Sequence, residues 1–117
     1  MLTVYAYEQC STCRTALKWL AAHDIAHRVV AIREQPPTVV ELARMLATQG
    51  GEVKAICNRS GQDYRALGLK DRLPTMTTAE ALTLLASNGN LVKRPFVLGP
   101  KVALVGFDAA VWGAALG

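Results

Sequence analysis

The first 32 residues place a strand, a helix and a second strand in direct succession, and this order constrains the fold more than any other feature. Residues 2–7 (LTVYAY) are rich in strand-forming side chains. From residue 12 to about residue 24 the apolar residues recur at helical spacing, and residues 26–32 (AHRVVAI) again favour a strand. A chain that alternates strands and helices in this way is typical of a layered α/β domain.

The centre of the chain is predicted to be helical. Thr38 is a good N-cap with Glu41 as its capping-box partner, and the Gly50-Gly51 pair should end that helix. Short helices should follow, interrupted by Ser60-Gly61 and Gly68. A clearer helix starts at an N-cap on Thr77 or Thr78, and we expect it to stop at Gly89.

The last quarter predicts two short strands and a final helix. The segment RPFVLGPKVALVGF, residues 94–107, has two β-rich runs joined by Gly99-Pro100-Lys101, which favours an antiparallel hairpin. Residues 108–117 then favour a short apolar helix. With no repeat or long linker in its 117 residues, the chain should form one domain over 1–117, with a helical insertion at roughly 38–89.

Composition and charge exclude several classes of function. Hydrophobic residues make up 51% and charged residues 19%, and no apolar run approaches the ~20 residues that span a bilayer. The N-terminus lacks the features of an export signal, so we expect a cytoplasmic, soluble monomer with no membrane contact. The net charge of +4 is spread along the chain, which disfavours direct nucleic-acid binding and suits small anions better.

Two cysteines, Cys10 and Cys13, lie at the predicted junction between the first strand and the first helix. A thiol at a helix N-terminus faces unpaired N–H groups and the positive end of the helix dipole, which favour the thiolate. Cys13, one turn later, could resolve a mixed disulfide formed at Cys10, and Arg14 adds a positive charge. The alternative is that both cysteines are only small residues at a turn.

A structural zinc site needs about four ligands, and this chain offers few beyond the cysteine pair. The other soft ligands are Cys57, His23 and His27, with no second CxxC motif. We therefore expect no metal site, and we expect Cys57 to be a small buried residue.

A second informative stretch is LVKRPFVLG, residues 91–99. Proline cannot donate a ladder hydrogen bond, so Pro95 marks the start of a strand or a special turn. If Pro95 faces the cysteine pair, Arg94 would bring a guanidinium close to Cys10, where it could bind an anion or lower the pKa of the thiol. The alternative is an exposed arginine next to an ordinary trans proline.

Taken together, these motifs resemble the arsenate reductase (ArsC)-like branch of the thioredoxin-fold superfamily, which includes the Spx/MgsR-type regulators of RNA polymerase. The resemblance is carried by YEQCSTCRTALKWL, PPTVVELARML, NRSGQDYRALGLKDRLPTM, LLASNGNLVKRPFVLG and VALVGFDAAVW, in that order. It implies a thioredoxin-like three-layer α/β/α fold with a mixed four-stranded sheet and a helical insertion. A cis-proline before the third strand faces the active cysteine in such folds, which implies this position for Pro95.

The resemblance also implies roles for individual residues. Cys10 matches the family's nucleophile, Arg94 with Pro95 matches the Arg-Pro pair that faces it, and Cys13 matches the second cysteine of the regulators. Arsenate reductases use two further arginines; this chain has Asn58 at the first position, with Arg59 next to it, and none in KVALVGF. We therefore expect Arg59, with Arg14 and Pro95, to contact the substrate, and we expect a substrate other than arsenate.

The resemblance predicts a thiol–disulfide redox protein that binds no cofactor. Its reductant would be an external thiol, either glutathione with glutaredoxin or thioredoxin, and its substrate a thiol, a disulfide or a small oxyanion. The alternative is a redox-sensing regulator that docks on the α subunit of RNA polymerase through a Cys10–Cys13 switch. A third alternative is a thioredoxin-fold relative whose cysteines react slowly.

Overall fold

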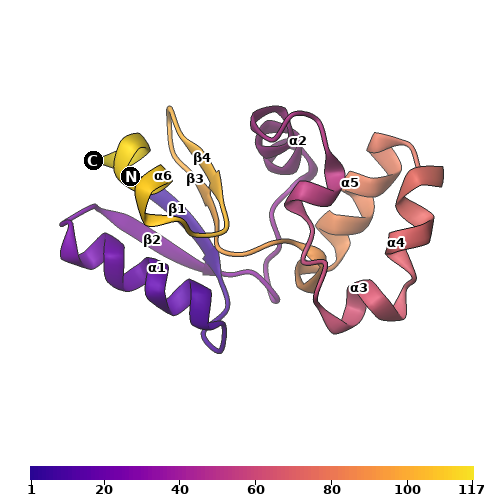
Figure 1. Cartoon of the computed structure of the whole chain (residues 1–117), viewed down its shortest axis with the longest axis horizontal. Coiled ribbons are helices and arrows are strands. Elements are labelled where there is room, and N and C mark those ends of the chain that lie inside the picture. The colour runs from indigo at the N-terminus through magenta and orange to yellow at the C-terminus, as the bar shows by residue number, and fades with distance from the viewer.

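A four-stranded mixed sheet forms one half of the protein and a helical insertion the other (Figure 1), as the computed structural model of residues 1–117 shows. The strands are β1 (Leu2–Ala6), β2 (His27–Ala31), β3 (Phe96–Leu98) and β4 (Ala103–Val105). Their order across the sheet is β2-β1-β3-β4, with β2 parallel to β1 and the other two pairings antiparallel. The predicted fold class and the antiparallel hairpin at the end of the chain are confirmed.

The side chains of β1 and β3 alternate between two hydrophobic cores, one on each face of the sheet. Val4 and Val97 point into one core, while Tyr5 and Phe96 point into the other. This alternation follows from the two-residue period of a strand, and the apolar character of both sets explains why both faces are covered.

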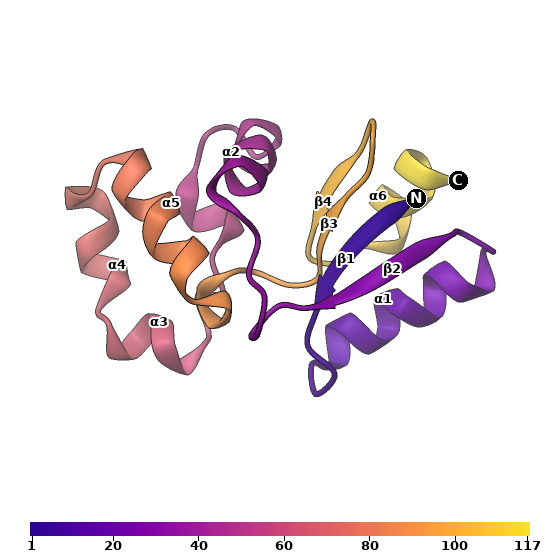
Figure 2. The ribbon, with the colours of Figure 1, turned by 180° about the vertical axis from the view of Figure 1, so that it is seen from behind.

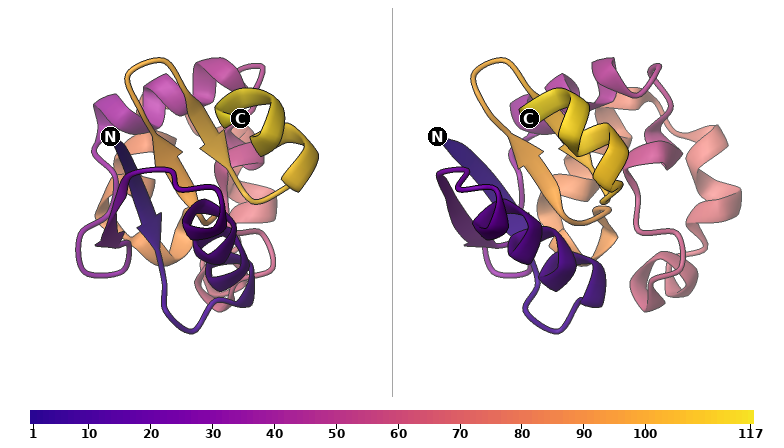
Figure 3. Two further views of the ribbon diagram at one scale, coloured as in Figure 1. Left: turned by 90° about the vertical axis from the view of Figure 1, so that its left-hand side faces the viewer. Right: turned by 60° about the vertical axis from the view of Figure 1, so that its left-hand side comes forward.

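Helices α1 (Ser11–Ala22) and α6 (Ala109–Leu116) cover one face of the sheet (Figure 3). We call the core beneath them the α1–α6 core; it contains Cys13, Leu20 and the fully buried Trp112. Even α1, the longest helix, has only 12 residues. None of the helices combines the length and apolar character required to cross a membrane.

The helical insertion covers the other face of the sheet (Figure 2). Its elements are α2 (Val39–Thr48), η1 (Val53–Ile56), α3 (Gln62–Ala66), α4 (Leu69–Arg72), η2 (Leu73–Thr75), α5 (Thr78–Ser87) and η3 (Gly89–Leu91), where η marks a 3-10 helix. We call the second core, which joins this insertion to the sheet, the insertion core; it contains Leu42, Leu85 and Phe96.

The two longest helices of the insertion begin with capping boxes. Thr38 accepts a hydrogen bond from the N–H of Glu41, and the Glu41 carboxylate accepts one from the N–H of Thr38. Thr77 and Glu80 make the same pair of bonds, which settles the predicted choice between Thr77 and Thr78. Each box satisfies N–H groups that a helix start leaves unpaired.

Gly89 directly follows the end of α5, as the sequence predicts, although it is not the C-cap itself. The helix ends at Ser87 with Asn88 as its C-cap, and Gly89 begins η3. Glycine is needed here because its backbone meets the chain leaving β2: a Cβ on Gly89 would lie 1.8 Å from the carbonyl oxygen of Ile32. The glycine therefore marks a close backbone contact between the sheet and the insertion.

Candidate active site

The Cys10 thiol occupies the N-cap position of α1, as the sequence predicts. A short loop connects β1 to α1. Cys10 ends this loop in an extended conformation (φ −87°, ψ 117°), immediately before the first helical residue. Its Sγ atom accepts a hydrogen bond from the N–H of Cys13 at 3.3 Å. Cys10 is half-buried and forms no disulfide, so its sulfur is available for reaction.

The surroundings of Cys10 favour its thiolate. Burial by itself raises the pKa of Cys10. Hydrogen bonds from the thiol and the backbone of Cys13, together with the charge and a hydrogen bond of Arg94, lower it by more than burial raises it. The net result is a pKa below the ordinary value of a cysteine. A lowered pKa at a helix N-terminus is typical of nucleophilic cysteines.

Cys13 has the opposite character. It is buried in the α1–α6 core, and burial, aided by the hydrogen bond and the charge of Cys10, raises the pKa of Cys13 to about 12. The pair thus consists of one accessible thiol with a lowered pKa and one buried thiol with a raised pKa. This asymmetry makes Cys10 the more reactive of the two thiols.

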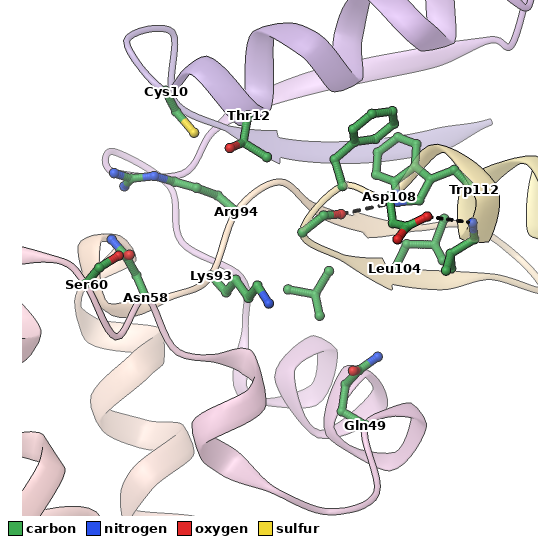
Figure 4. A pocket seen from close by; sticks show the side chains of 14 residues that line it. Cys10, Thr12, Gln49, Asn58, Ser60, Lys93, Arg94, Leu104, Asp108 and Trp112 are labelled. Atoms are coloured by element: carbon green, nitrogen blue, oxygen red, sulfur yellow. Dashed lines mark hydrogen bonds between the residues drawn. The ribbon is translucent and has the colours of Figure 1, made fainter.

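Arg94 and Cys10 line the same cavity, which has a volume of about 630 Å³ (Figure 4). The peptide bond between Arg94 and Pro95 is cis, and the carbonyl of Pro95 accepts a hydrogen bond from Gly106 at 2.9 Å. The Nη1 atom of Arg94 is buried and has no hydrogen-bond partner. An unpaired guanidinium N–H beside a thiolate is suited to bind an anionic group that enters the cavity.

The remaining walls of the cavity come from both halves of the molecule. Polar groups are supplied by the first turn of α1, the C-cap of α2, the loop before α3, the segment leading to β3 and the N-cap of α6. An apolar wall is supplied by β4, α6 and the loop between them. The lining residues besides Cys10 and Arg94 are Thr12, Gln49, Asn58, Ser60, Lys93, Leu104, Val105, Gly106, Phe107, Asp108, Val111 and Trp112. The cavity therefore combines the Cys10 thiol, two cations and the Asp108 carboxylate with an apolar and aromatic wall.

Gly106 makes room for one of these cations. Its φ of +71° is in the left-handed region, and a Cβ there would lie 3.0 Å from the Cε atom of Lys93. The Trp112 indole donates a hydrogen bond to the Gly106 carbonyl at 3.2 Å, which holds the apolar wall against the same turn. Lys93 thus reaches the cavity over a glycine turn.

None of the three predicted substrate contacts lines this cavity, and Pro95 is buried beside Arg94. The guanidinium of Arg14 donates a hydrogen bond to the Glu8 carbonyl at 2.9 Å and lines a separate cavity beside β2. Arg59 is exposed and lines two other cavities, although its neighbours Asn58 and Ser60 face Cys10's cavity. The structure brings Cys10, Cys13 and Arg94 together, and it leaves the roles of Arg14 and Arg59 as predictions.

The sequence reasoning missed Lys93 and the apolar wall. Lys93 stands directly before the Arg94-Pro95 pair, so its position next to a predicted site residue was the available signal. The predicted burial of Cys57 is correct: its thiol donates to the Val53 carbonyl at 3.3 Å, and burial raises the pKa of Cys57 to about 11. No three His, Cys, Asp or Glu side chains gather where they could hold a metal ion.

The chain is similar along most of its length to several bacterial proteins. It is 43% identical to the uncharacterized protein YusI of Bacillus subtilis, over 91% of this chain and 90% of that protein. It is 33% identical to the global transcriptional regulator Spx of Enterococcus faecalis, over 92% and 80%. The regulatory protein MgsR of Bacillus subtilis is 30% identical over 92% and 83%.

Solved structures agree with this relationship. A possible arsenate reductase from Streptococcus mutans superposes with a TM-score of 0.90 at 38% identity, covering 99% of this chain and 98% of that one. An ArsC family related protein from Bacteroides fragilis gives a TM-score of 0.90 at 42% identity, covering 97% and 95%. The profile of the ArsC family matches residues 5–115, and this chain therefore belongs to the ArsC family.

Proposed function

We propose that this protein is a thiol–disulfide oxidoreductase in which Cys10 is the nucleophile, Cys13 the resolving thiol and Arg94 the group that binds the anionic part of the substrate. The observation that carries the proposal is the hydrogen-bonded Cys10–Cys13 pair at the start of α1, with Arg94 in the same cavity. Membership of the ArsC family supports it.

The reaction begins with attack of the Cys10 thiolate on one sulfur of a substrate disulfide. A bond forms between Cys10 Sγ and that sulfur, the substrate S–S bond breaks, and the other sulfur leaves as a thiolate. Cys13 then loses its proton and attacks Cys10 Sγ, which releases the second substrate thiolate and leaves a Cys10–Cys13 disulfide. Two electrons have passed from the pair to the substrate.

The first step itself prepares Cys13 for the second. Burial is the main reason that the pKa of Cys13 is high, but the hydrogen bond to Cys10 and the charge of its thiolate add to it. Both of these contributions vanish when Cys10 becomes a mixed disulfide, whereas the charge of Arg94 remains and favours the Cys13 thiolate. Cys13 therefore keeps its proton before the first step and loses it more easily once the mixed disulfide has formed.

The cavity favours an organic substrate over a small oxyanion. Its volume of about 630 Å³ is of the size that takes a small organic molecule. Phe107, Val111 and Trp112 give it an apolar wall that a tetrahedral oxyanion would not use. We therefore propose a low-molecular-weight or peptide disulfide with an anionic group, and an external dithiol or glutathione, expected in the cytoplasm, that reduces the Cys10–Cys13 disulfide.

The proposal is tested with two serine variants and a disulfide substrate, such as the mixed disulfide between glutathione and a small aromatic thiol. Cys10→Ser should abolish turnover, because no thiolate remains to attack. Cys13→Ser should perform the first step and then accumulate a mixed disulfide at Cys10, visible by mass spectrometry of the intact protein. Cys57→Ser serves as the control and should keep its turnover. Full activity in Cys10→Ser would disprove the mechanism.

A second function, redox-sensing regulation, is favoured by the similarity to Spx and MgsR. Here the Cys10–Cys13 disulfide would change the affinity for a partner such as the α subunit of RNA polymerase. Pull-down with the purified α subunit, under reducing and then oxidising conditions, tests this reading. Binding that differs between the two conditions and is lost in Cys13→Ser would support it, and absence of binding in both would reject it.

A further inference from the structure

Tyr7 lies three residues before Cys10, and its aromatic ring contacts two guanidinium groups. The Cζ atom of Arg94 is 5.0 Å from the ring centroid and that of Arg33 is 4.8 Å away. Cations within about 6 Å of a tyrosine ring face are attracted by the electron density of the ring. Arg33 also donates a hydrogen bond from Nη1 to the Tyr7 hydroxyl at 2.8 Å. The ring is thus held between the chain after β2 and the segment before β3.

The backbone of Tyr7 contacts both thiol-bearing residues. Its carbonyl accepts a hydrogen bond from the N–H of Cys10 at 3.0 Å, and its backbone lies close enough to the Cys13 thiol to lower the pKa of that thiol. One residue therefore touches the nucleophile, its neighbour and the cation that acts on them. The proposed reaction uses Cys10, Cys13 and Arg94 but assigns nothing to Tyr7.

Arg94 needs such a contact, because its side chain is long and its buried Nη1 atom has no hydrogen-bond partner. A flexible guanidinium in a cavity of about 630 Å³ could turn away from Cys10 toward the open side. The Tyr7 ring gives it a flat surface to rest on without neutralising its charge, as a carboxylate would. The charge thus stays available both to Cys10 and to a substrate.

We propose that Tyr7 is a positioning residue of this site, whose ring holds the guanidinium of Arg94 next to Cys10. The proposal rests on the proposed function of Cys10 and Arg94 and deepens it. Tyr7 itself takes no part in bond formation.

The test compares Tyr7→Leu with Tyr7→Phe by the rate of iodoacetamide alkylation of Cys10 as a function of pH, with Cys57 already changed to alanine in every protein. The groups that face Cys10 are Cys13 and Arg94, and only the position of Arg94 should change. Tyr7→Leu should shift the profile to higher pH and slow alkylation near neutral pH about two- to fivefold, the factor expected from losing one cation–π contact. Tyr7→Phe keeps the ring and should match the unchanged protein.

A double-mutant cycle separates positioning from a general structural role. In an Arg94→Ala background, Tyr7→Leu should produce no further slowing, since the cation that the ring holds is already absent. Tyr5→Phe, on the strand just before, loses a hydroxyl that bonds Glu41 far from Cys10 and is the matched control; it should leave the profile unchanged. Equal slowing by Tyr7→Leu in both backgrounds would overturn the proposal.

If Tyr7→Leu does not fold, as judged by circular dichroism, phenylalanine and pentafluorophenylalanine at residue 7 give the same comparison at nearly constant shape. The fluorinated ring should slow alkylation, because its face no longer attracts a cation. Equal rates for the two rings would overturn the proposal. An ordinary alkylation profile in the unchanged protein would instead reject the proposed function, so the two failures are distinguishable.

Discussion

At the scale of single residues, the three cysteines differ in how folding changes their proton affinity. Folding lowers the pKa of Cys10 and raises that of Cys13 and Cys57. Cys57 is the simplest case, because burial raises its pKa to about 11 and only the charge of Arg59 opposes this. A buried thiol with a raised pKa does not lower the free energy of unfolding as long as the unfolded chain also keeps that proton. It lowers it once the unfolded chain loses the proton.

The stability of the protein should therefore fall in mildly alkaline solution. Above the unperturbed thiol pKa of ~8.5 the unfolded chain releases the Cys57 proton while the folded chain retains it, so the free energy of unfolding decreases as pH rises. The loss from this residue is complete at about pH 11, where the folded thiol also ionises. Urea unfolding between these limits should show a declining midpoint, and Cys57→Ala should show a shallower decline. Parallel curves for the two proteins would contradict this assignment.

At the scale of elements, the contact between η3 and the chain leaving β2 fixes the insertion to the sheet. Gly89 allows the two backbones to meet, and the carboxylate of Asp63 accepts hydrogen bonds from the side chains of Asn88 at 3.0 Å and Asn90 at 3.1 Å. Asn58, which lines the cavity, donates to the Asn90 carbonyl at 3.3 Å. The contact thus also positions one wall of the site.

Two substitutions of glycine by alanine should have opposite effects. Gly89→Ala forces a methyl group against the Ile32 backbone and should destabilise the fold by about 1–3 kcal/mol or more, the usual cost of overpacking. Gly113→Ala, in α6 with nothing within 4 Å of the added carbon, should stabilise it by up to about 1 kcal/mol. Chemical denaturation of both variants measures the difference. A Gly89→Ala protein as stable as the Gly113→Ala protein would show that the close backbone contact is absent.

At the scale of the whole molecule, the protein is elongated, with extents of 42 × 27 × 23 Å, because the insertion lies beside the sheet instead of wrapping around it. The elements themselves could be predicted, since they depend on local patterns such as the capping box of Thr38 and Glu41 or the position of Cys10 before α1. The composition of the cavity could not, because it depends on how the insertion core sets Asn58 and Ser60 against the sheet.

The direction of a single side chain was equally beyond the sequence. Arg14 belongs to the same helix start as Cys10, but helical side chains point back toward the N-terminus, and its guanidinium reaches the Glu8 carbonyl on another side of the loop. Arg94, some eighty residues away in sequence, supplies the charge beside Cys10 instead. The prediction that Arg94 lies near Cys10 depends on the family resemblance, which carries the tertiary contacts that local patterns lack.

The cavity has walls that belong to two separately packed cores: Cys10 packs against the α1–α6 core, and Asn58 follows Cys57 of the insertion core. The α1–α6 core therefore sets the thiol and the apolar wall of the cavity, and the insertion core sets its polar wall. Under the proposed function, randomising Gln49, Asn58 and Ser60 should change which disulfides are accepted while the chemistry of Cys10 stays the same. The same division would let related chains diverge in what they bind without rebuilding the nucleophile.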